Sequence, residues 1–207
     1  MKQILCFGDS NTYGLIPGTT ERYGWNTRWT GILDEKVREK GYRVIEEGLC
    51  GRTTVFDDPL RDGRRGTELL SVLLETHKPI DMVVLMLGTN DCKMVYDASA
   101  EVIGKGVERL LNQIESSNPN SKVLLVSPIE LGYGVWEEGF DPEFNEASRE
   151  VSKKLPKVYG RIAKERNLYF LPASKYAEPS EADREHLDEN GHRILADAIF
   201  HKIEEVI

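Results

Sequence analysis

The fold is decided by the stretch Met82-Val83-Val84-Leu85-Met86-Leu87-Gly88-Thr89-Asn90-Asp91. Its first six residues are apolar without polar alternation, which predicts a strand that is covered on both faces, as in a parallel sheet. Glycine and polar residues follow at once and mark the end of that strand. Proteins with open α/β sheets carry their sites at this carboxyl end, so the polar residues after it are candidate functional residues.

Other short apolar runs predict four more strands, at residues 4–7, 43–45, 123–126 and 168–171. Apolar residues at helical spacing predict the intervening helices, at about 29–41, 69–74, 103–114, 143–165 and 195–206. Pro156 is expected to kink or break the helix at 143–165. The alternation of strands and helices predicts a three-layer α/β sandwich with a mostly parallel sheet. The length of 207 residues predicts one domain over residues 1–207.

Composition excludes several classes of protein. The net charge of −8 argues against a nucleic-acid partner, because such proteins usually carry a basic excess. Three widely spaced cysteines (Cys6, Cys50 and Cys92) form no disulfide or zinc pattern and favour a reducing cytoplasm. No stretch approaches the ~20 apolar residues of a membrane span, and the amino-terminal apolar run is too short for a signal peptide. We therefore expect a soluble cytoplasmic protein without a membrane partner.

Polar residues follow the first three predicted strands. Ser10 comes directly after the first strand, Gly51 lies in a turn after the second, and Asn90 follows the third. Taken singly, each has a simpler structural explanation, namely a helix cap, a βα turn and an Asx cap. Together they bring a hydroxyl, free backbone N–H groups and an amide to one edge of the sheet.

Asp183 and His186 precede the last predicted helix and are three residues apart. A carboxylate beside an imidazole fixes its tautomer and stabilises the imidazolium that forms when the ring accepts a proton. With Ser10 as nucleophile and His186 as base, the set fills every role in acyl transfer. The N–H groups of Ser10 and Gly51 and the Asn90 amide would form the oxyanion hole.

These four blocks, namely Gly8-Asp9-Ser10, Gly51, Gly88-Thr89-Asn90-Asp91 and Asp183 through His186, resemble the SGNH (GDSL-type) hydrolases in type and order. The resemblance spans essentially the whole chain. It implies a flavodoxin-like sheet of five parallel strands and a serine mechanism without metal or cofactor.

The chain looks most similar to the bacterial arylesterase/acyltransferase branch, on residues 4–10, 28–31, 44–49, 52–54, 57–59 and 86–91. That branch acts on short acyl esters, some members transfer acyl groups, and some form higher oligomers, so a homo-oligomer stays open. Two positions depart from the family pattern. Asn11 stands where leucine is commonest, and Arg184-Glu185 fills a gap that usually holds a small residue.

The sequence predicts a serine esterase that hydrolyses short-chain, acetyl-type esters of aryl, alkyl or sugar alcohols, with acyl transfer as a further reaction. The alternatives are a carbohydrate deacetylase or a thioesterase of the same fold. A metal-dependent phosphoesterase built on Asp9, Asn90 and His186 would need an Asp-x-His pair, which the first block lacks. A nucleotide-binding module has no support, because neither a P-loop lysine nor Gly-x-Gly-x-x-Gly follows a strand.

Several other residues are predicted to surround the site. The candidates for substrate binding are Asp9 and Asn11, with Tyr133, Trp136 and Phe140 from the long loop at 130–142. Arg52 is expected to pair with an acidic neighbour, one of Glu46, Glu47, Asp57 and Asp58. The cluster Arg61, Arg64 and Arg65 is expected to form surface ion pairs, with an anionic substrate tail as the alternative.

Overall fold

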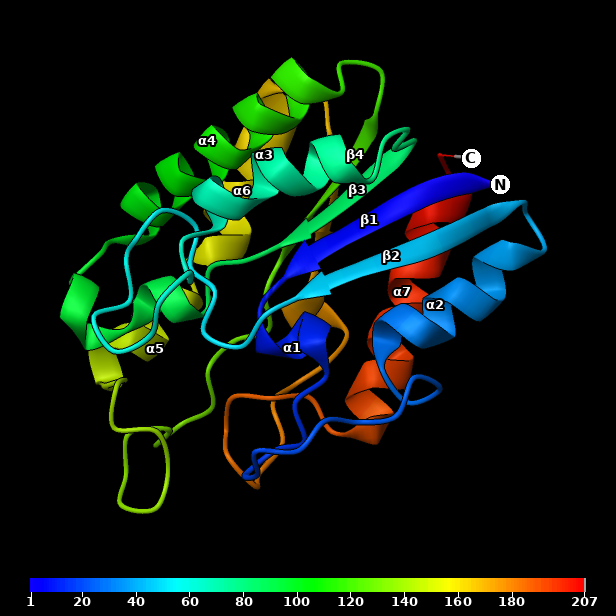
Figure 1. Cartoon of the computed structure of the whole chain (residues 1–207). Coiled ribbons are helices and arrows are strands. Elements are labelled where there is room, and N and C mark those ends of the chain that lie inside the picture. The colour runs from blue at the N-terminus through cyan, green and yellow to red at the C-terminus, as the bar shows by residue number, and fades with distance from the viewer. Residues whose placement is uncertain (207) are drawn as a thin grey trace.

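The computed structural model describes residues 1–206 and contains a parallel sheet of five strands in the order β2-β1-β3-β4-β5 (Figure 1). The strands are β1 (Lys2–Gly8), β2 (Tyr42–Gly48), β3 (Met82–Met86), β4 (Lys122–Ser127) and β5 (Tyr169–Pro172). Gly8 lies opposite both Gly48 and Met86, so the first three strands end at the same level.

Helices cover both faces of the sheet (Figure 1). One face carries α3 (Gly66–Thr76), α4 (Ala100–Ser117) and α6 (Leu155–Glu165), and the other carries α2 (Trp29–Arg38) and α7 (Glu189–Glu204). The remaining elements are the short helices α1 (Ser10–Tyr13) and α5 (Glu146–Ser152) and the 3₁₀ turns η1 (Asn90–Cys92), η2 (Met94–Tyr96) and η3 (Ala173–Lys175). The predicted three-layer α/β sandwich with a five-stranded parallel sheet is confirmed.

Alternate residues of each central strand enter two separate hydrophobic cores. In β1, Leu5 and Phe7 pack toward α3, α4 and α6, whereas Ile4 and Cys6 pack toward α2 and α7. All four are fully buried. This explains the absence of polar alternation in the sequence, because a strand between two helical layers has no solvent face.

The helix that was expected at 143–165 is two helices. Asn145 caps α5 through a reciprocal pair of hydrogen bonds with Ser148. A second helix, α6, begins at Leu155 with Pro156 in its first turn. Proline is tolerated there because the first N–H groups of a helix have no intrahelical acceptor. The predicted break is confirmed, and the expected start at 143 lies in the preceding loop.

The loops after the strands gather at the carboxyl end of the sheet, beside α1 (Figure 1). The amino-terminal end of β1 lies at the opposite end of the sheet. Among residues 1–206, no helix combines the length and the apolar composition needed to cross a bilayer.

Candidate active site

Ser10 is the first residue of α1 and follows β1 after a single residue, Asp9. The Asp9 side chain caps this helix by accepting a hydrogen bond of 3.1 Å from the Asn11 N–H. Helix α1 packs directly on the end of β2, where a Cβ at Gly48 would lie 2.1 Å from the Tyr13 nitrogen. Glycine at position 48 therefore lets α1 approach the sheet and fixes Ser10 at its edge.

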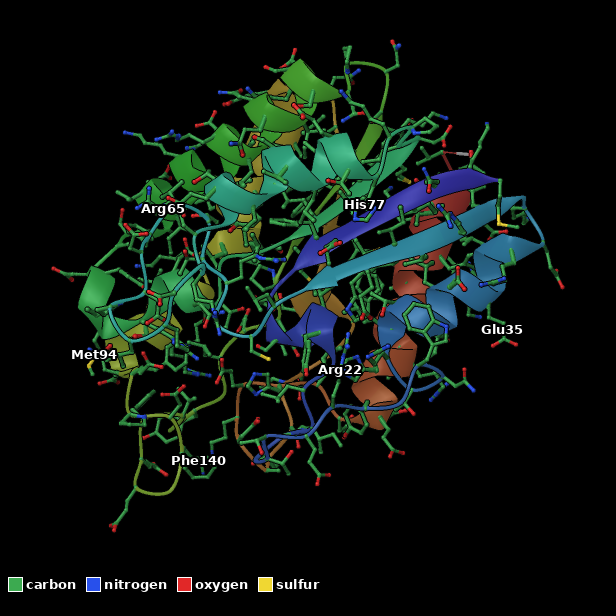
Figure 2. All side chains as sticks on the ribbon, viewed as in Figure 1. Arg22, Glu35, Arg65, His77, Met94 and Phe140 are labelled. Carbon is green, nitrogen blue, oxygen red and sulfur yellow. The ribbon has the colours of Figure 1, made fainter. Side chains whose placement is uncertain are left out.

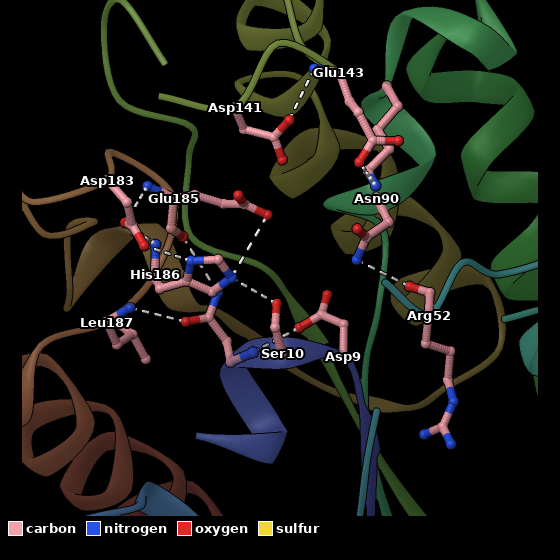
Figure 3. Close-up of polar contacts among 12 residues, drawn as sticks. Asp9, Ser10, Arg52, Asn90, Asp141, Glu143, Asp183, Glu185, His186 and Leu187 are labelled. Atoms are coloured by element: carbon pink, nitrogen blue, oxygen red, sulfur yellow. Dashed lines mark hydrogen bonds and ion pairs between the residues drawn. The ribbon is translucent and has the colours of Figure 1, made fainter. Parts of the chain in front are cut away.

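Ser10, His186 and Asp183 form one continuous row of hydrogen bonds (Figure 3). The Ser10 Oγ lies 2.8 Å from His186 Nε2, and Asp183 Oδ2 lies 2.7 Å from His186 Nδ1. The other carboxylate oxygen of Asp183 accepts from the backbone N–H groups of Glu185 and His186, at 3.0 and 2.9 Å. Asp183 thus orients both the imidazole ring and the backbone that carries it.

The side chain of Asn11 contacts the segment that carries His186. Its side-chain amide donates to the Glu185 carbonyl at 3.4 Å, and its Oδ1 accepts from the Leu187 N–H at 2.9 Å. Both polar ends of the side chain therefore bind the backbone on either side of His186. Asn11 thereby connects α1 to the histidine segment. Substrate contact by Asn11 stays a prediction.

Asn90 and the turn that carries Gly51 are also held together. Asn90 is almost fully buried in η1, and its side-chain amide donates to the Arg52 carbonyl at 3.2 Å. Gly51 has a φ of +80°, a left-handed conformation that glycine adopts without steric cost. Within residues 1–206, neither the Ser10 N–H nor the Gly51 N–H donates to a protein acceptor. Both backbone donors remain available to a ligand.

Arg52 stabilises this turn through backbone carbonyls and not through the carboxylates that the sequence suggested. Its Nη1 donates to the Gly8 carbonyl at 2.8 Å and also to the Glu47 carbonyl. The guanidinium lies over the Phe7 ring, 4.1 Å from the centroid. Burial lowers the pKa of Arg52 to about 10. Arg52 links the ends of β1 and β2, so the expected pairing with an acidic side chain is wrong.

A buried carboxylate braces the other side of the turn. Asp91 accepts from the Thr54 N–H at 3.0 Å and from the Thr54 hydroxyl. Because Asp91 lies next to Asn90 in η1, this contact fixes η1 against residues 50–54. Burial raises the pKa of Asp91 to about 6, even though the Thr54 hydrogen bonds act in the opposite direction.

The charges around His186 change its protonation. Burial disfavours the imidazolium, but the carboxylates of Glu185 and Asp183 outweigh burial and raise the pKa of His186 to about 9. Burial also acts to raise the pKa of Asp183, but its hydrogen bond to His186 and the charge of that ring hold it at about 2. Burial raises the pKa of Asp9 to about 7. His186 and Asp183 therefore favour their charged forms.

Glu185 is a residue of this site for which the sequence predicted no role. Its side chain is only 8% exposed, and its Oε1 lies 3.7 Å from His186 Nε2. The signal in the sequence was a glutamate directly before the histidine, in place of a small residue. Sequence alone gave no means of knowing that it points inward.

Two of the three aromatic residues of the loop at 130–142, Tyr133 and Phe140, contact arginines. Tyr133 is 68% exposed and meets Trp136 edge to face, with Arg149 over its ring. Phe140 lies on the outer part of the loop, and Arg184 lies 4.0 Å above its ring centroid (Figure 2). The loop is anchored to the histidine segment by a 2.8 Å bond from the Gly132 N–H to the Arg184 carbonyl. Substrate contact by these aromatic residues stays a prediction, as it does for Asp9.

The arginine cluster is engaged with protein groups. Arg61 pairs with Asp58 and Glu143, and Arg65 pairs with Asp57 and Glu68. Arg64 donates instead to the carbonyls of Cys50, at 2.9 Å, and Asp62. The expectation of surface ion pairs is confirmed for Arg61 and Arg65.

This arrangement suits nucleophilic acyl transfer. A hydroxyl is hydrogen-bonded to an imidazole whose second nitrogen is held by a carboxylate, which is the geometry that activates serine. Two free N–H groups and an amide lie on the adjoining segments, where an oxyanion would need donors. Both ring nitrogens of His186 already have protein partners, Ser10 and Asp183.

Known proteins with related sequences and structures are esterases. The sequence model of the GDSL-like lipase/acylhydrolase family matches residues 6–198. An inhibitor-bound aryl esterase from M. smegmatis is 33% identical, with all of both chains covered and a TM-score of 0.94. A carbohydrate acetylesterase from Sinorhizobium meliloti is 34% identical, also over all of both chains, with a TM-score of 0.92. A search of curated protein sequences gave no match.

The fold and these relatives define a carboxylic ester hydrolase with an SGNH-type α/β sheet. The chain belongs to the GDSL-like lipase/acylhydrolase family. The family resemblance inferred from the four sequence blocks is confirmed.

Proposed function

We propose that this protein hydrolyses short-chain acyl esters, of the acetyl type, through a Ser10–His186–Asp183 triad. The observation that carries the proposal is the unbroken row of hydrogen bonds from the Ser10 hydroxyl through both nitrogens of His186 to Asp183. The small-molecule ester would bind with its carbonyl carbon at Ser10 Oγ and its carbonyl oxygen at the oxyanion donors.

The geometry supports the following reaction steps. Neutral His186 accepts the Ser10 proton through Nε2 as the hydroxyl attacks, and Asp183 stabilises the resulting imidazolium. The Ser10 and Gly51 N–H groups and the Asn90 amide receive the oxyanion. His186 then protonates the leaving alcohol, and water attacks the acyl-enzyme by the reverse sequence. An alcohol in place of that water would give acyl transfer.

We propose aryl, alkyl or sugar alcohols carrying short acyl groups as the substrate class, and the relatives support its aryl and sugar members. One relative is an aryl esterase and another a carbohydrate acetylesterase, and both match this chain over its full length. A thioesterase reaction would use the same groups, and parallel assays with acetyl thioesters separate it from ester hydrolysis.

The proposal is tested with nitrophenyl esters of increasing acyl length. We expect higher kcat/KM for the acetyl ester than for the octanoyl ester, and covalent labelling of Ser10 by a sulfonyl fluoride. Activity should persist after treatment with a metal chelator. A clear preference for octanoyl contradicts the short-chain assignment, and labelling that does not occur at Ser10 contradicts the mechanism.

Asn90→Ala removes one of the three proposed oxyanion donors. Loss of such a donor costs about 10²–10³ in kcat, and we expect KM to change little because the interaction strengthens in the transition state. Steady-state kinetics with nitrophenyl acetate measure both constants. Asn112→Ala is the matched control, because Asn112 lies on α4 and its Oδ1 contacts Arg166. Equal kcat in Asn90→Ala and wild type contradicts the oxyanion role.

The pH dependence of kcat/KM reports the protonation of His186 in the free enzyme. Only neutral imidazole can accept the Ser10 proton, and the pKa of His186 is raised to about 9. Activity should therefore rise with pH through neutrality, with its midpoint well above the ordinary histidine value of 6.5. A profile with a midpoint at or below 6.5 contradicts the conclusion that the carboxylates of Glu185 and Asp183 raise the pKa of His186.

A further inference from the structure

Glu185 is a buried carboxylate that the proposed mechanism does not use. Its side chain is 8% exposed, and within residues 1–206 its carboxylate accepts no hydrogen bond from a protein donor. Its one close charged neighbour is His186, 3.7 Å away at Nε2. The backbone on both sides is fixed, since the Glu185 N–H donates to Asp183 and its carbonyl accepts from Asn11. The inward position of this carboxylate is therefore built into the segment.

The carboxylate of Glu185 faces the space in front of Ser10. Figure 3 shows the side chain extending from the Asp183 segment toward the region between His186 and Asn90. Other charged groups around this region are Asp183, Asp141, Lys93 and His186, which all act on Glu185 electrostatically. Together with Glu185, three carboxylates face two cationic groups, so negative charge exceeds positive charge there.

The neighbouring cations are already committed to other carboxylates. Lys93 lies 2.7 Å from Glu143, and Arg184 lies 2.6 Å from Glu137. The imidazolium of His186 offsets the charge of Glu185 in the resting protein, but His186 must be neutral to accept the Ser10 proton. At that moment Glu185 becomes a desolvated carboxylate without a partner, which is costly. A cation that arrives with the substrate removes this cost.

The position of Glu185 indicates which half of an ester would supply that cation. In the proposed mechanism, His186 Nε2 accepts the proton of the Ser10 hydroxyl and then donates it to the leaving oxygen. Each of these oxygens must therefore lie about 3 Å from Nε2. A carboxylate 3.7 Å from the same nitrogen lies beside the leaving oxygen and the first carbons of the alcohol. The acyl group lies on the other side of the carbonyl carbon. Glu185 is thus a neighbour of the alcohol.

We propose that Glu185 determines specificity for the alcohol half of the ester. It favours acyl esters of amino alcohols in which a positively charged nitrogen is attached to the second carbon from the ester oxygen. The inference rests on the proposed esterase function and goes beyond it by assigning the charge of the leaving group. An ester whose alcohol carries a carboxylate is disfavoured by the same residue.

Acetylcholine and 3,3-dimethylbutyl acetate test the proposal, because they have nearly the same shape and differ by one positive charge. We expect wild type to prefer acetylcholine about tenfold in kcat/KM, the factor that roughly 1.4 kcal/mol of binding difference produces. In Glu185→Gln, which keeps the shape and removes the charge, the ratio should fall to about one. Glu181→Gln is the control, since it removes an exposed carboxylate of the same loop and should keep the wild-type ratio.

A wild-type ratio of one or below overturns the proposal, as does an unchanged ratio in Glu185→Gln. Glu185→Val supplies the same comparison if the glutamine variant does not fold. An ester with an anionic alcohol should react faster in either variant than in wild type, and a slower reaction there also counts against the proposal. Hydrolysis of nitrophenyl acetate distinguishes failure of the Glu185 proposal from failure of the proposed esterase function. If wild type shows no preference for the cationic ester but hydrolyses nitrophenyl acetate in a Ser10-dependent reaction, the role of Glu185 alone is rejected.

Discussion

Ser10→Ala is expected to lower kcat for nitrophenyl acetate by about 10⁴–10⁶, as in other enzymes with a serine nucleophile. The substitution removes the atom that His186 holds at 2.8 Å and that would form the acyl-enzyme. Residual turnover would come from binding and the oxyanion donors alone. Kinetics and mass spectrometry after a short exposure to substrate measure the lost rate and the absent acyl adduct.

Ser127→Ala is the matched control for this substitution. Ser127 is fully buried and ends β4 at the same edge of the sheet, but its hydroxyl has no hydrogen-bond partner within residues 1–206. It should retain wild-type kcat. If Ser10→Ala kept more than one-tenth of the activity, another nucleophile would have to be sought.

Asp183→Asn is expected to lower kcat by about 10⁴, the cost of an inverted histidine tautomer in a serine triad. An amide NH₂ facing His186 Nδ1 would require that nitrogen to accept, which leaves the proton on Nε2. The imidazole would then have no lone pair for the Ser10 hydroxyl. The asparagine oxygen still accepts from the N–H groups of Glu185 and His186, so the segment should keep its shape.

Asp188→Asn is the control for that prediction. Asp188 lies on the same segment and caps α7 by accepting from the Gly191 N–H, and asparagine caps helices equally well. Circular dichroism should show that both variants are folded at the assay temperature, and only Asp183→Asn should lose turnover. Comparable kcat in the two variants would remove Asp183 from the mechanism.

The central strands of the sheet were predictable because burial on both faces requires a run of apolar residues without polar alternation. The apolar run at 82–87 corresponds to β3 (Met82–Met86), with the site at its carboxyl end. Edge strands are harder to recognise, because their sequences are less uniformly apolar. Most of β2 is only partly buried, and its predicted core of 43–45 was shorter than the observed Tyr42–Gly48. The break near Pro156 followed from the missing N–H of proline, whereas the short α1 and the 3₁₀ turns had no periodicity to reveal them.

Side-chain partners between distant segments were harder to predict. Asn11 and Arg52 are polar residues beside the proposed nucleophile and oxyanion turn, so substrate contact and an acidic partner were reasonable expectations. In the structure both satisfy backbone groups of other segments. Such pairings depend on how the loops meet after the sheet has formed, and neither residue type nor spacing encodes them. The inward orientation of Glu185 has the same origin.

The Ser10–His186 hydrogen bond joins positions that are 176 residues apart in the chain. During synthesis the serine therefore leaves the ribosome early as an ordinary alcohol, long before its base has been translated. In the proposed mechanism, Ser10 becomes reactive only when the segment that carries His186 lies against the first βα turn. A nascent chain that ends before residue 186 therefore lacks the base that the proposed mechanism requires for acylation of Ser10.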